Sequence, residues 1–293
     1  MLQTIRKYAR NSSLVRKFIS YYLVPSGVFD KRFMNIPLSQ EWSNRLAETV
    51  KCIDNKYIAR VANAGKIIRG KQVMHNGLLI NLGSYYGPEV ARILHDNKGV
   101  HEPQEERVFS EVLKVMPEGA TMIELGAFWS FYSMWFNKEV VNGQNYMIEP
   151  SAFNMGQGQR NFKLNGMTGH FTNAFIGKEK GRVEGVQVIC IDEFVREHDI
   201  HFIDVLHSDI QGFEYDMLQG SVETFDSAKV GYVFISTHTN EVHDKCKEFL
   251  IDYKFNILAN VNLDETYSQD GLIVGRAPYY EGIQSISLDL KGI

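Results

Sequence analysis

The sequence predicts an α/β fold in which helices cover both faces of a mostly parallel β-sheet. Two observations lead to this prediction. From Gly99 onward, short apolar runs of strand length alternate with segments of helical periodicity, which is the order that parallel sheets require. Small and polar residues follow several of these runs, as they do where parallel strands end beside a ligand. The 293-residue chain is 44% hydrophobic and 23% charged, so it can bury a substantial core.

The elements expected after Gly99 follow one another in this alternating order. Pro103 marks the start of the first helix, because the first turn of a helix does not need the N–H that proline lacks. After it, each apolar run predicts a strand and each amphipathic stretch predicts a helix. The predicted strands are 121–125, 145–148, 169–174, 183–190, 203–208, 231–237 and an antiparallel pair at 255–261 and 272–275. The predicted helices are 102–116, 129–140, 153–164, 192–198, 213–218 and 240–253.

Residues 1–98 are predicted to form an accessory or lid region, mainly helical, ahead of a catalytic domain at 99–293. Apolar residues recur at helical spacing up to about residue 22 and again over 41–68. The segment 73–80 predicts a short hairpin, because its Asn-Gly pair supplies the positive φ angles of a tight turn. We expect this region either to cover the acceptor side of the site or to form a homodimer contact.

The charge distribution argues against a nucleic-acid partner. The chain carries 31 basic and 35 acidic residues, a net charge of −4, and so has no overall attraction for a polyanion. Residues 1–40 hold seven Lys or Arg against one acid, a net of +6, which leaves −10 for the rest. A solvated helix face is the expected role of this basic segment, and contact with an anionic membrane surface or an acidic glycan is the alternative.

Cysteine usage and hydropathy favour a cytoplasmic location. The three cysteines, Cys52, Cys190 and Cys246, form no CxxC pair, which suits a reducing compartment. No apolar run approaches the ~18–20 residues of a membrane span, and the first residues lack the order of a signal peptide. We therefore expect a cytoplasmic protein without a transmembrane segment.

Three features at expected strand ends predict a site for a nucleoside-containing ligand. In the first, a strand that holds Glu124 passes through Gly126 and Ser130 into a helix whose first N–H groups are free. The second is Glu149, 23 positions beyond Gly126, which is placed to accept both hydroxyls of a ribose. The third is the polar segment 207–214. The chain lacks G-x-G-x-x-G and G-x-x-x-x-G-K-[ST], which disfavours nicotinamide, flavin and NTP ligands, whereas S-adenosylmethionine has a ribose but no pyrophosphate.

The same residues resemble the motifs of FkbM-type methyltransferases. The resemblance is carried by MIELGAFWSFYSMWF (122–136), MIEPSAFNMGQGQRNFKLN (147–165), 188–194 and IDVLHSDIQGFEYDMLQG (203–220). It implies a class I, Rossmann-like, seven-stranded sheet over about residues 99–276 that binds S-adenosylmethionine. Glu124 and Ser130 stand where the first family motif has Asp and a second Gly. His207 and Gln211 stand where a later motif has Lys and Glu.

The resemblance also implies where the cofactor would lie. Residues after the first strand would line its methionine part, and residues after the next two strands would hold its ribose and its adenine. The expected contacts are Glu124, Gly126, Phe128 and Ser130 on the methionine side, Glu149, Pro150 and Ser151 at the ribose, Asn173 and Ala174 at the adenine, and Asp209 near the sulfonium.

Two mechanisms are open for the acceptor side of the site. Methyl transfer from a sulfonium is a direct displacement, so the protein mainly aligns the acceptor, the methyl group and the sulfur. An alcohol also loses a proton, for which a neutral histidine is a suitable base, and we favour His238 over His207. In the alternative, Asp209, His238 and Asn240 bind a divalent cation, Mg²⁺ or Mn²⁺, that acidifies a diol.

The function expected on this basis is S-adenosylmethionine-dependent O-methylation. The resemblance implies a small-molecule or glycan acceptor, with the hydroxyl on a sugar, a glycan or a natural product. Two alternatives stay open. One is a non-catalytic, cofactor-binding scaffold of a biosynthetic complex, and the other is an N-methyltransferase, which needs no strong base. Formation of S-adenosylhomocysteine with an acceptor separates an enzyme from a scaffold.

Overall fold

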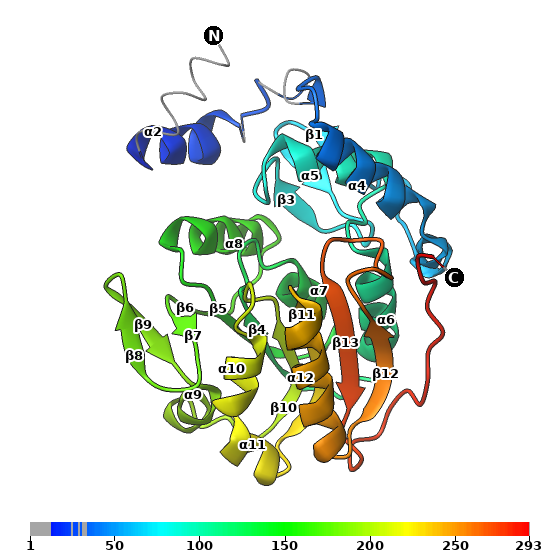
Figure 1. Ribbon diagram of the computed structural model, residues 1–293. Helices are drawn as coiled ribbons and strands as arrows, with labels where there is room; N and C mark the ends of the chain where they lie inside the picture. Colours follow the sequence, from blue (N-terminus) through cyan, green and yellow to red (C-terminus); the bar gives the residue numbers. More distant parts are fainter. Residues whose placement is uncertain (1–12, 25, 29, 31–33, 293) are drawn as a thin grey trace.

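The structure is a computed structural model that describes residues 13–292 except 25, 29 and 31–33. At its centre lies a β-sheet of seven strands. The strand order is β12-β13-β11-β10-β4-β5-β6. Neighbouring strands from β11 to β6 pair in parallel, and β13 runs antiparallel to both of its neighbours. The predicted mostly parallel, seven-stranded α/β sheet is therefore confirmed (Figure 1). The strands are β4 (Thr121–Leu125), β5 (Gln144–Ile148), β6 (His170–Thr172), β10 (Ile203–Ser208), β11 (Val230–Thr237), β12 (Asn256–Val261) and β13 (Gly271–Arg276).

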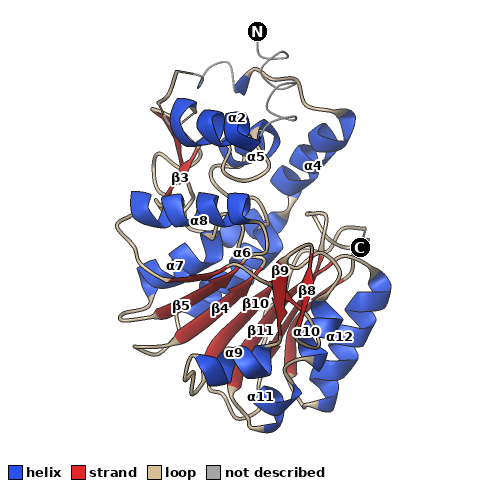
Figure 2. Cartoon of the chain, turned by 90° about the vertical axis from the view of Figure 1, so that its left-hand side faces the viewer, coloured by secondary structure: helices blue, strands red, loops and turns tan. Residues whose placement is uncertain are grey.

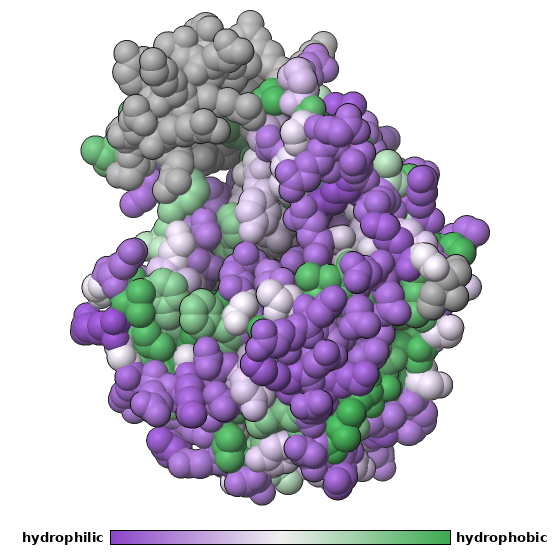
Figure 3. Space-filling view, in the orientation of Figure 1, coloured by the Kyte–Doolittle hydropathy of each residue, from purple (hydrophilic) through white to green (hydrophobic). Residues whose placement is uncertain are grey.

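Helices cover both faces of this sheet (Figure 2). Successive strand residues point to opposite faces, so Met122 packs in a core with Phe109, whereas Ile123 packs in a second core with Phe194. The outer side of α12 is mainly hydrophilic, as expected for a helix with one buried face (Figure 3). One layer contains α6 (Pro103–Leu113), α7 (Phe131–Glu139) and α8 (Ala152–Leu164), and the other contains α9 (Ile191–Glu197), α10 (Glu214–Gln219), α11 (Val222–Asp226) and α12 (Asn240–Asp252).

Three predicted elements differ from the structure. The helical pattern expected over 41–68 ends with the 3-10 turn at Ile53–Tyr57, because the chain then turns at 62–65 and forms a strand at Ile67–Ile68. The strand expected at 183–190 is a hairpin of β8 (Gly181–Val183) and β9 (Val186–Ile189), which form a separate three-stranded sheet with β7 (Phe175–Ile176). The chain turns between β8 and β9 because two successive residues have φ angles of 50° and 82°. The helix expected at 129–140 begins only at Phe131, because the residue before it has a left-handed φ of 59°.

The described part of residues 1–98 lies over the carboxyl edge of the sheet (Figure 1). The predicted hairpin is present as β2 and β3. Met74 and Ile80 pack in the same core as Phe109 and Met122, so this region shares a core with the predicted catalytic domain. The domain boundary proposed at 98/99 stays a prediction. The elements here are α2 (Ser13–Phe18), the π-helical turn η1 (Ile19–Leu23), α4 (Gln40–Lys51), the 3-10 turn η2 (Ile53–Tyr57), β1 (Ile67–Ile68), β2 (Lys71–Val73), β3 (Leu79–Asn81) and α5 (Pro88–Asp96).

The first predicted helix and the basic charge around it fall partly outside the described residues. Within the described part, Tyr21 of η1 stacks on Phe153 of α8, with ring centroids 5.7 Å apart. Its hydroxyl donates a hydrogen bond of 3.2 Å to the Phe153 carbonyl. Among all described residues of the chain, no helix is long and apolar enough to cross a membrane.

Candidate active site

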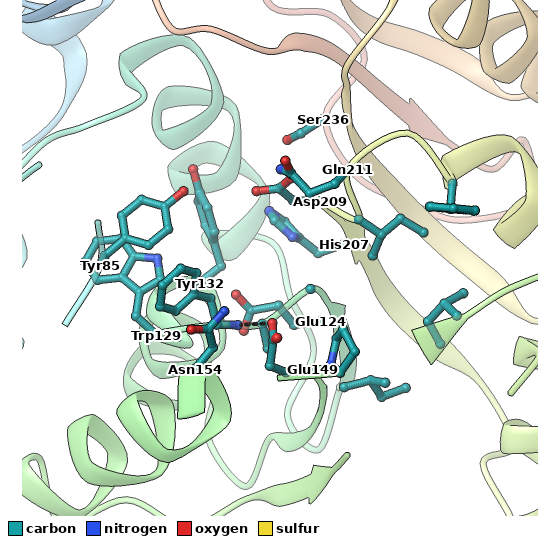
Figure 4. A pocket seen from close by; sticks show the side chains of 18 of the residues that line it. Tyr85, Glu124, Trp129, Tyr132, Glu149, Asn154, His207, Asp209, Gln211 and Ser236 are labelled. Atoms are coloured by element: carbon teal, nitrogen blue, oxygen red, sulfur yellow. Dashed lines mark hydrogen bonds between the residues drawn. The ribbon is translucent and has the colours of Figure 1, made fainter. Parts of the chain in front are cut away.

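A cavity of about 470 Å³ lies where β4, β5, β10 and β11 end (Figure 4). The turns after these strands form one side of it, and Tyr85, Tyr86 and the start of α6 form the other. The predicted site residues that line the cavity are Glu124, Gly126, Phe128, Glu149, Pro150, Ala174, His207 and Asp209. The predicted residues that do not line it are Ser130, Ser151, Asn173, His238 and Asn240.

Gly126 is required by the protein's own backbone. Its φ is 74°, and a Cβ at this position would lie 1.8 Å from the Asp209 carbonyl oxygen. The sequence predicts a glycine that admits a ligand, and the structure adds that no side chain fits between the turns after β4 and β10. Phe128 and Ser130 follow with φ angles of 36° and 59°, so the turn holds two strained residues before α7 begins.

Glu149 is held in place by backbone donors on both carboxylate oxygens. Oε1 accepts a hydrogen bond of 2.8 Å from the N–H of Ser151, and Oε2 accepts one of 3.2 Å from the N–H of Phe128. Burial raises the pKa of Glu149, and these donors oppose that shift. Because each oxygen has a further lone pair, the carboxylate can also accept the two hydroxyls of a ribose.

Two of the predicted contacts, Ser151 and Asn173, form hydrogen bonds within the segment around Glu149. Ser151 begins α8, and its hydroxyl accepts a hydrogen bond from the N–H of Asn154, which itself lines the cavity. Asn173 donates from its side-chain amide to the carbonyls of Glu149 and Pro150, at 2.9 and 2.8 Å. Ser151 and Asn173 therefore do not line the cavity themselves, and their expected contacts with the cofactor stay predictions.

Ser130 is the third predicted contact that lies behind the cavity wall. Its side chain is buried against α8, where a Cβ added to Gly158 would come within 2.3 Å of the Ser130 hydroxyl. Ser130 stands where the family motif has its second glycine, and its side chain packs against α8 at Gly158.

Glu124 is a buried carboxylate that lines the cavity. One oxygen accepts a hydrogen bond of 3.1 Å from the N–H of Ser133 in α7. Burial raises the pKa of Glu124 to about 7. A cation beside this group would favour its ionised form, which suits the ammonium of an amino acid.

His207 and His238 have different surroundings, although both follow strands at this edge. His207 lines the cavity, and its Nε2 lies 2.6 Å from Glu105 Oε1. His238 lies outside the cavity wall, with Nδ1 2.9 Å from Glu214 Oε1 and Nε2 3.3 Å from both Asp209 Oδ1 and Asp270 Oδ1. Burial lowers the pKa of His238, but these carboxylates outweigh it and raise the pKa to about 10. Both ring nitrogens of His238 therefore face carboxylates, and the choice of His238 as the base stays a prediction.

The predicted metal ligands do not converge on one point. Asn240 is exposed, and its side-chain oxygen accepts a hydrogen bond of 3.4 Å from the N–H of Leu263. Both ring nitrogens of His238 already have carboxylate partners. Across the described residues, no group of three or more His, Cys, Asp or Glu side chains is arranged to hold a metal ion.

The acidic residues at the start of α6 were not among the predicted site residues. Glu102 lies 3.1 Å from His101 Nε2, and Glu106 lies 2.7 Å from His101 Nδ1. Burial lowers the pKa of His101, yet the two glutamates raise it to about 10. The available signal was the run His101-Glu-Pro-Gln-Glu-Glu106, whose acids look like ordinary first-turn residues that favour the helix dipole.

Aromatic rings form the wall of the cavity opposite Asp209 (Figure 4). Tyr85 stacks on Trp129, with ring centroids 4.6 Å apart and an interplanar angle of 5°. Tyr132 donates a hydrogen bond of 3.1 Å from its hydroxyl to Glu102 Oε2. Burial raises the pKa of Glu102, but His101 and other neighbours lower it to about 2, so this part of the wall holds a carboxylate paired with His101.

A protein-family model described as the methyltransferase FkbM domain matches residues 108–257. Among solved structures, a methyltransferase FkbM from Methylobacillus flagellatus KT is 18% identical, with a TM-score of 0.42 and coverage of 55% of this chain and 44% of that chain. The chain thus spans less than half the length of that protein.

Two further solved structures are similar at this level. A precorrin-6y C5,15-methyltransferase from Geobacter metallireducens GS-15 is 15% identical, with a TM-score of 0.42 and coverage of 59% of this chain and 88% of that chain. TrmK from M. capricolum, in complex with S-adenosylhomocysteine, is 14% identical, with a TM-score of 0.40 and coverage of 62% and 70%. No curated protein matches the sequence.

Proposed function

Because the chain belongs to the FkbM methyltransferase domain family, whose members use S-adenosylmethionine, we propose that it methylates a hydroxyl of a sugar, glycan or natural-product acceptor. The observation that carries this proposal is the composition of the cavity. One end holds Glu124, Glu149 and Ala174, and the other end holds stacked aromatic rings beside ionised carboxylates. A single cavity can therefore accommodate a nucleoside and a second, polar molecule together.

The residues at the first end fit the cofactor. Glu149 would accept the ribose hydroxyls, Glu124 would face the ammonium of the methionine part, and Ala174 would border the adenine. When bound, S-adenosylmethionine supplies an electrophilic methyl group on a sulfonium. The protein contributes binding, alignment and the exclusion of water around the reacting atoms.

The residues at the second end fit a polyhydroxylated ring. Tyr86, which is 48% exposed, offers an aromatic ring for the apolar side of a sugar, and the stacked pair of Tyr85 and Trp129 lies beside it. Glu102 and Asp209 can accept hydrogen bonds from its hydroxyls. A divalent cation is not part of the proposal, because the expected ligands do not converge. The cytoplasmic location and the homodimer contact through the N-terminal region stay predictions.

The test is turnover of S-adenosylmethionine with a panel of methyl glycosides, amino sugars and simple polyols. We expect S-adenosylhomocysteine to form with at least one hydroxylated acceptor, and mass spectrometry to place the methyl group on oxygen. EDTA should leave the rate unchanged. Methylation of the amino group alone would replace the proposal by N-methylation. Cofactor binding without product from any acceptor would favour the scaffold.

A further inference from the structure

His207 is fixed by a carboxylate that belongs to a distant part of the chain. Oε1 of Glu105, in the first turn of α6, lies 2.6 Å from His207 Nε2, at hydrogen-bond distance. Its other oxygen, Oε2, accepts a hydrogen bond of 3.1 Å from the hydroxyl of Ser236 at the end of β11. An ionised carboxylate only accepts hydrogen bonds, so a neutral imidazole beside it carries its proton on Nε2 and keeps a lone pair on Nδ1.

The Nδ1 atom of His207 has no hydrogen-bond partner among the described residues. The His207 side chain is 3% exposed and lines the cavity. A buried polar atom without a partner is unusual in a folded protein, and at a cavity wall it indicates a partner that arrives with the ligand. The corresponding nitrogen of His238 is already occupied by Glu214.

We propose that His207 is the general base for the acceptor hydroxyl and that Glu105 is its positioning residue. The inference rests on the proposed function, since it assumes a hydroxyl acceptor. The acceptor oxygen forms a bond to the methyl carbon while the bond from that carbon to sulfur breaks. The electron pair of the broken bond goes to sulfur, and the hydroxyl proton goes to His207 Nδ1. The products are a methyl ether, S-adenosylhomocysteine and an imidazolium paired with Glu105.

The surroundings of His207 stabilise the imidazolium that this step forms. Glu105 faces it from α6, Glu124 from the adjacent strand β4, and Asp209 from the turn after β10. The ring of Tyr132, from α7, lies with its centroid 4.4 Å away. Burial lowers the pKa of His207, but the hydrogen bond to Glu105 and the nearby carboxylates raise it overall. His207 stands where the family motif has a lysine, and Glu105 lies outside the residues that carried the resemblance.

The first test is the tautomer of His207, which needs no acceptor. We would record ¹⁵N spectra of histidine-labelled protein loaded with S-adenosylhomocysteine, and assign His207 by its loss in His207→Gln. The proposal predicts that neutral His207 is protonated on Nε2 and unprotonated on Nδ1. It also predicts that Glu105→Gln weakens this preference. A proton on Nδ1 in the neutral form would overturn the proposal.

The second test separates catalysis from binding. With an acceptor from the panel above, His207→Gln should lower kcat by about 10²–10⁴-fold, the usual contribution of a general base. The Kd for S-adenosylhomocysteine should stay within about threefold in the same variant, because the proposed cofactor contacts are elsewhere. Glu105→Gln should lower kcat less, with Glu105→Asp recovering part of the loss. His95→Gln, which removes a half-exposed histidine on α5, should keep full activity.

The two proposals fail in different ways. If S-adenosylhomocysteine does not bind the wild type, the proposed function fails, while the tautomer of the ligand-free protein still reports on the pair of His207 and Glu105. If an acceptor is methylated and His207→Gln retains kcat within threefold of wild type, the assignment of the base is wrong and the methyltransferase proposal stands.

Discussion

Burial controls the charge of single side chains around the cavity. Glu124 is the clearest case, because it sits on a strand, has one backbone donor and is otherwise buried. Its pKa of about 7 places its charge change near neutral pH. The charge state of this residue should therefore be coupled to cofactor binding.

We predict that the affinity for S-adenosylhomocysteine rises with pH through this pKa. Below pH 7, Glu124 must lose its proton before it can face the ammonium, so the Kd should fall by up to about tenfold per pH unit between pH 5.5 and 7. Isothermal titration across this range measures the slope. Asp270, whose pKa burial also raises to about 7, can add to it, so the informative comparison is with Glu124→Gln. Equal slopes in both proteins would show that Glu124 is not the coupled group.

Gly126 allows a second prediction about a single position. Gly126→Ala places a Cβ 1.8 Å from the Asp209 carbonyl oxygen, in a backbone conformation with φ of 74°. Gly166 has a similar φ of 68° but nothing within 4 Å of its Cβ position, so Gly166→Ala is the matched control. The control should lose about 1–2 kcal/mol of unfolding free energy from its backbone conformation, and Gly126→Ala should lose clearly more. Urea denaturation compares them, and equal losses would contradict the close approach of the two turns.

Among the elements, α6 has the largest influence on the acceptor side of the cavity. Its first turn and the residue before it supply Glu102, Glu105 and Glu106, and each of these meets at least one histidine. The helix thereby connects the N-terminal region, through His75, to the end of β10, through His207. These buried pairs should make stability depend on pH.

We predict that the free energy of unfolding falls between about pH 7 and pH 10. The pKa of His101 is about 10 in the folded protein, against an ordinary value of 6.5, so the folded state binds more protons over this range. The stabilisation is complete below pH 6.5 and is lost as the pH rises through 10. His101→Gln should be about 3–5 kcal/mol less stable at pH 7, because it leaves two buried carboxylates without their partner.

In His101→Gln, the free energy of unfolding should also depend less steeply on pH, since one of the contributing groups is gone. His238, with a pKa also near 10, keeps the slope from vanishing. His95→Gln serves as the control for loss of a half-exposed histidine. Urea denaturation at several pH values measures all three proteins. An unchanged slope in His101→Gln would mean that His101 is not charged in the folded state.

The protein as a whole combines a sheet that could be predicted with a cavity wall that could not. Glu124, Glu149 and Asp209 could be placed at this edge because each belongs to a strand end or the turn after it, which are local features of the sequence, and their contacts with the cofactor stay predictions. The carboxylate partners of His207 and His238 could not be predicted in this way. Glu105 is 102 positions from His207, and only the docking of α6 on the sheet brings them together.

Local sequence pattern also does not show which residues at a strand end serve the backbone or the packing of a helix. Ser130 and Asn173 occupy the positions expected for contacts, but one packs against α8 and the other holds a loop by its carbonyls. Predicting this would require the placement of α8 relative to the turns, which depends on contacts between segments far apart in the chain.

The central claim is that this cavity binds the cofactor of a methyltransferase, with Glu149 at the ribose. Isothermal titration with S-adenosylhomocysteine tests it most directly, on the wild type, Glu149→Ala and Glu248→Ala, the last being an exposed glutamate on α12. We predict saturable binding to the wild type and to Glu248→Ala, and binding at least about tenfold weaker to Glu149→Ala, because hydrogen bonds to a carboxylate are lost. Equal binding to all three proteins would place the cofactor elsewhere, and no binding to the wild type would contradict the account.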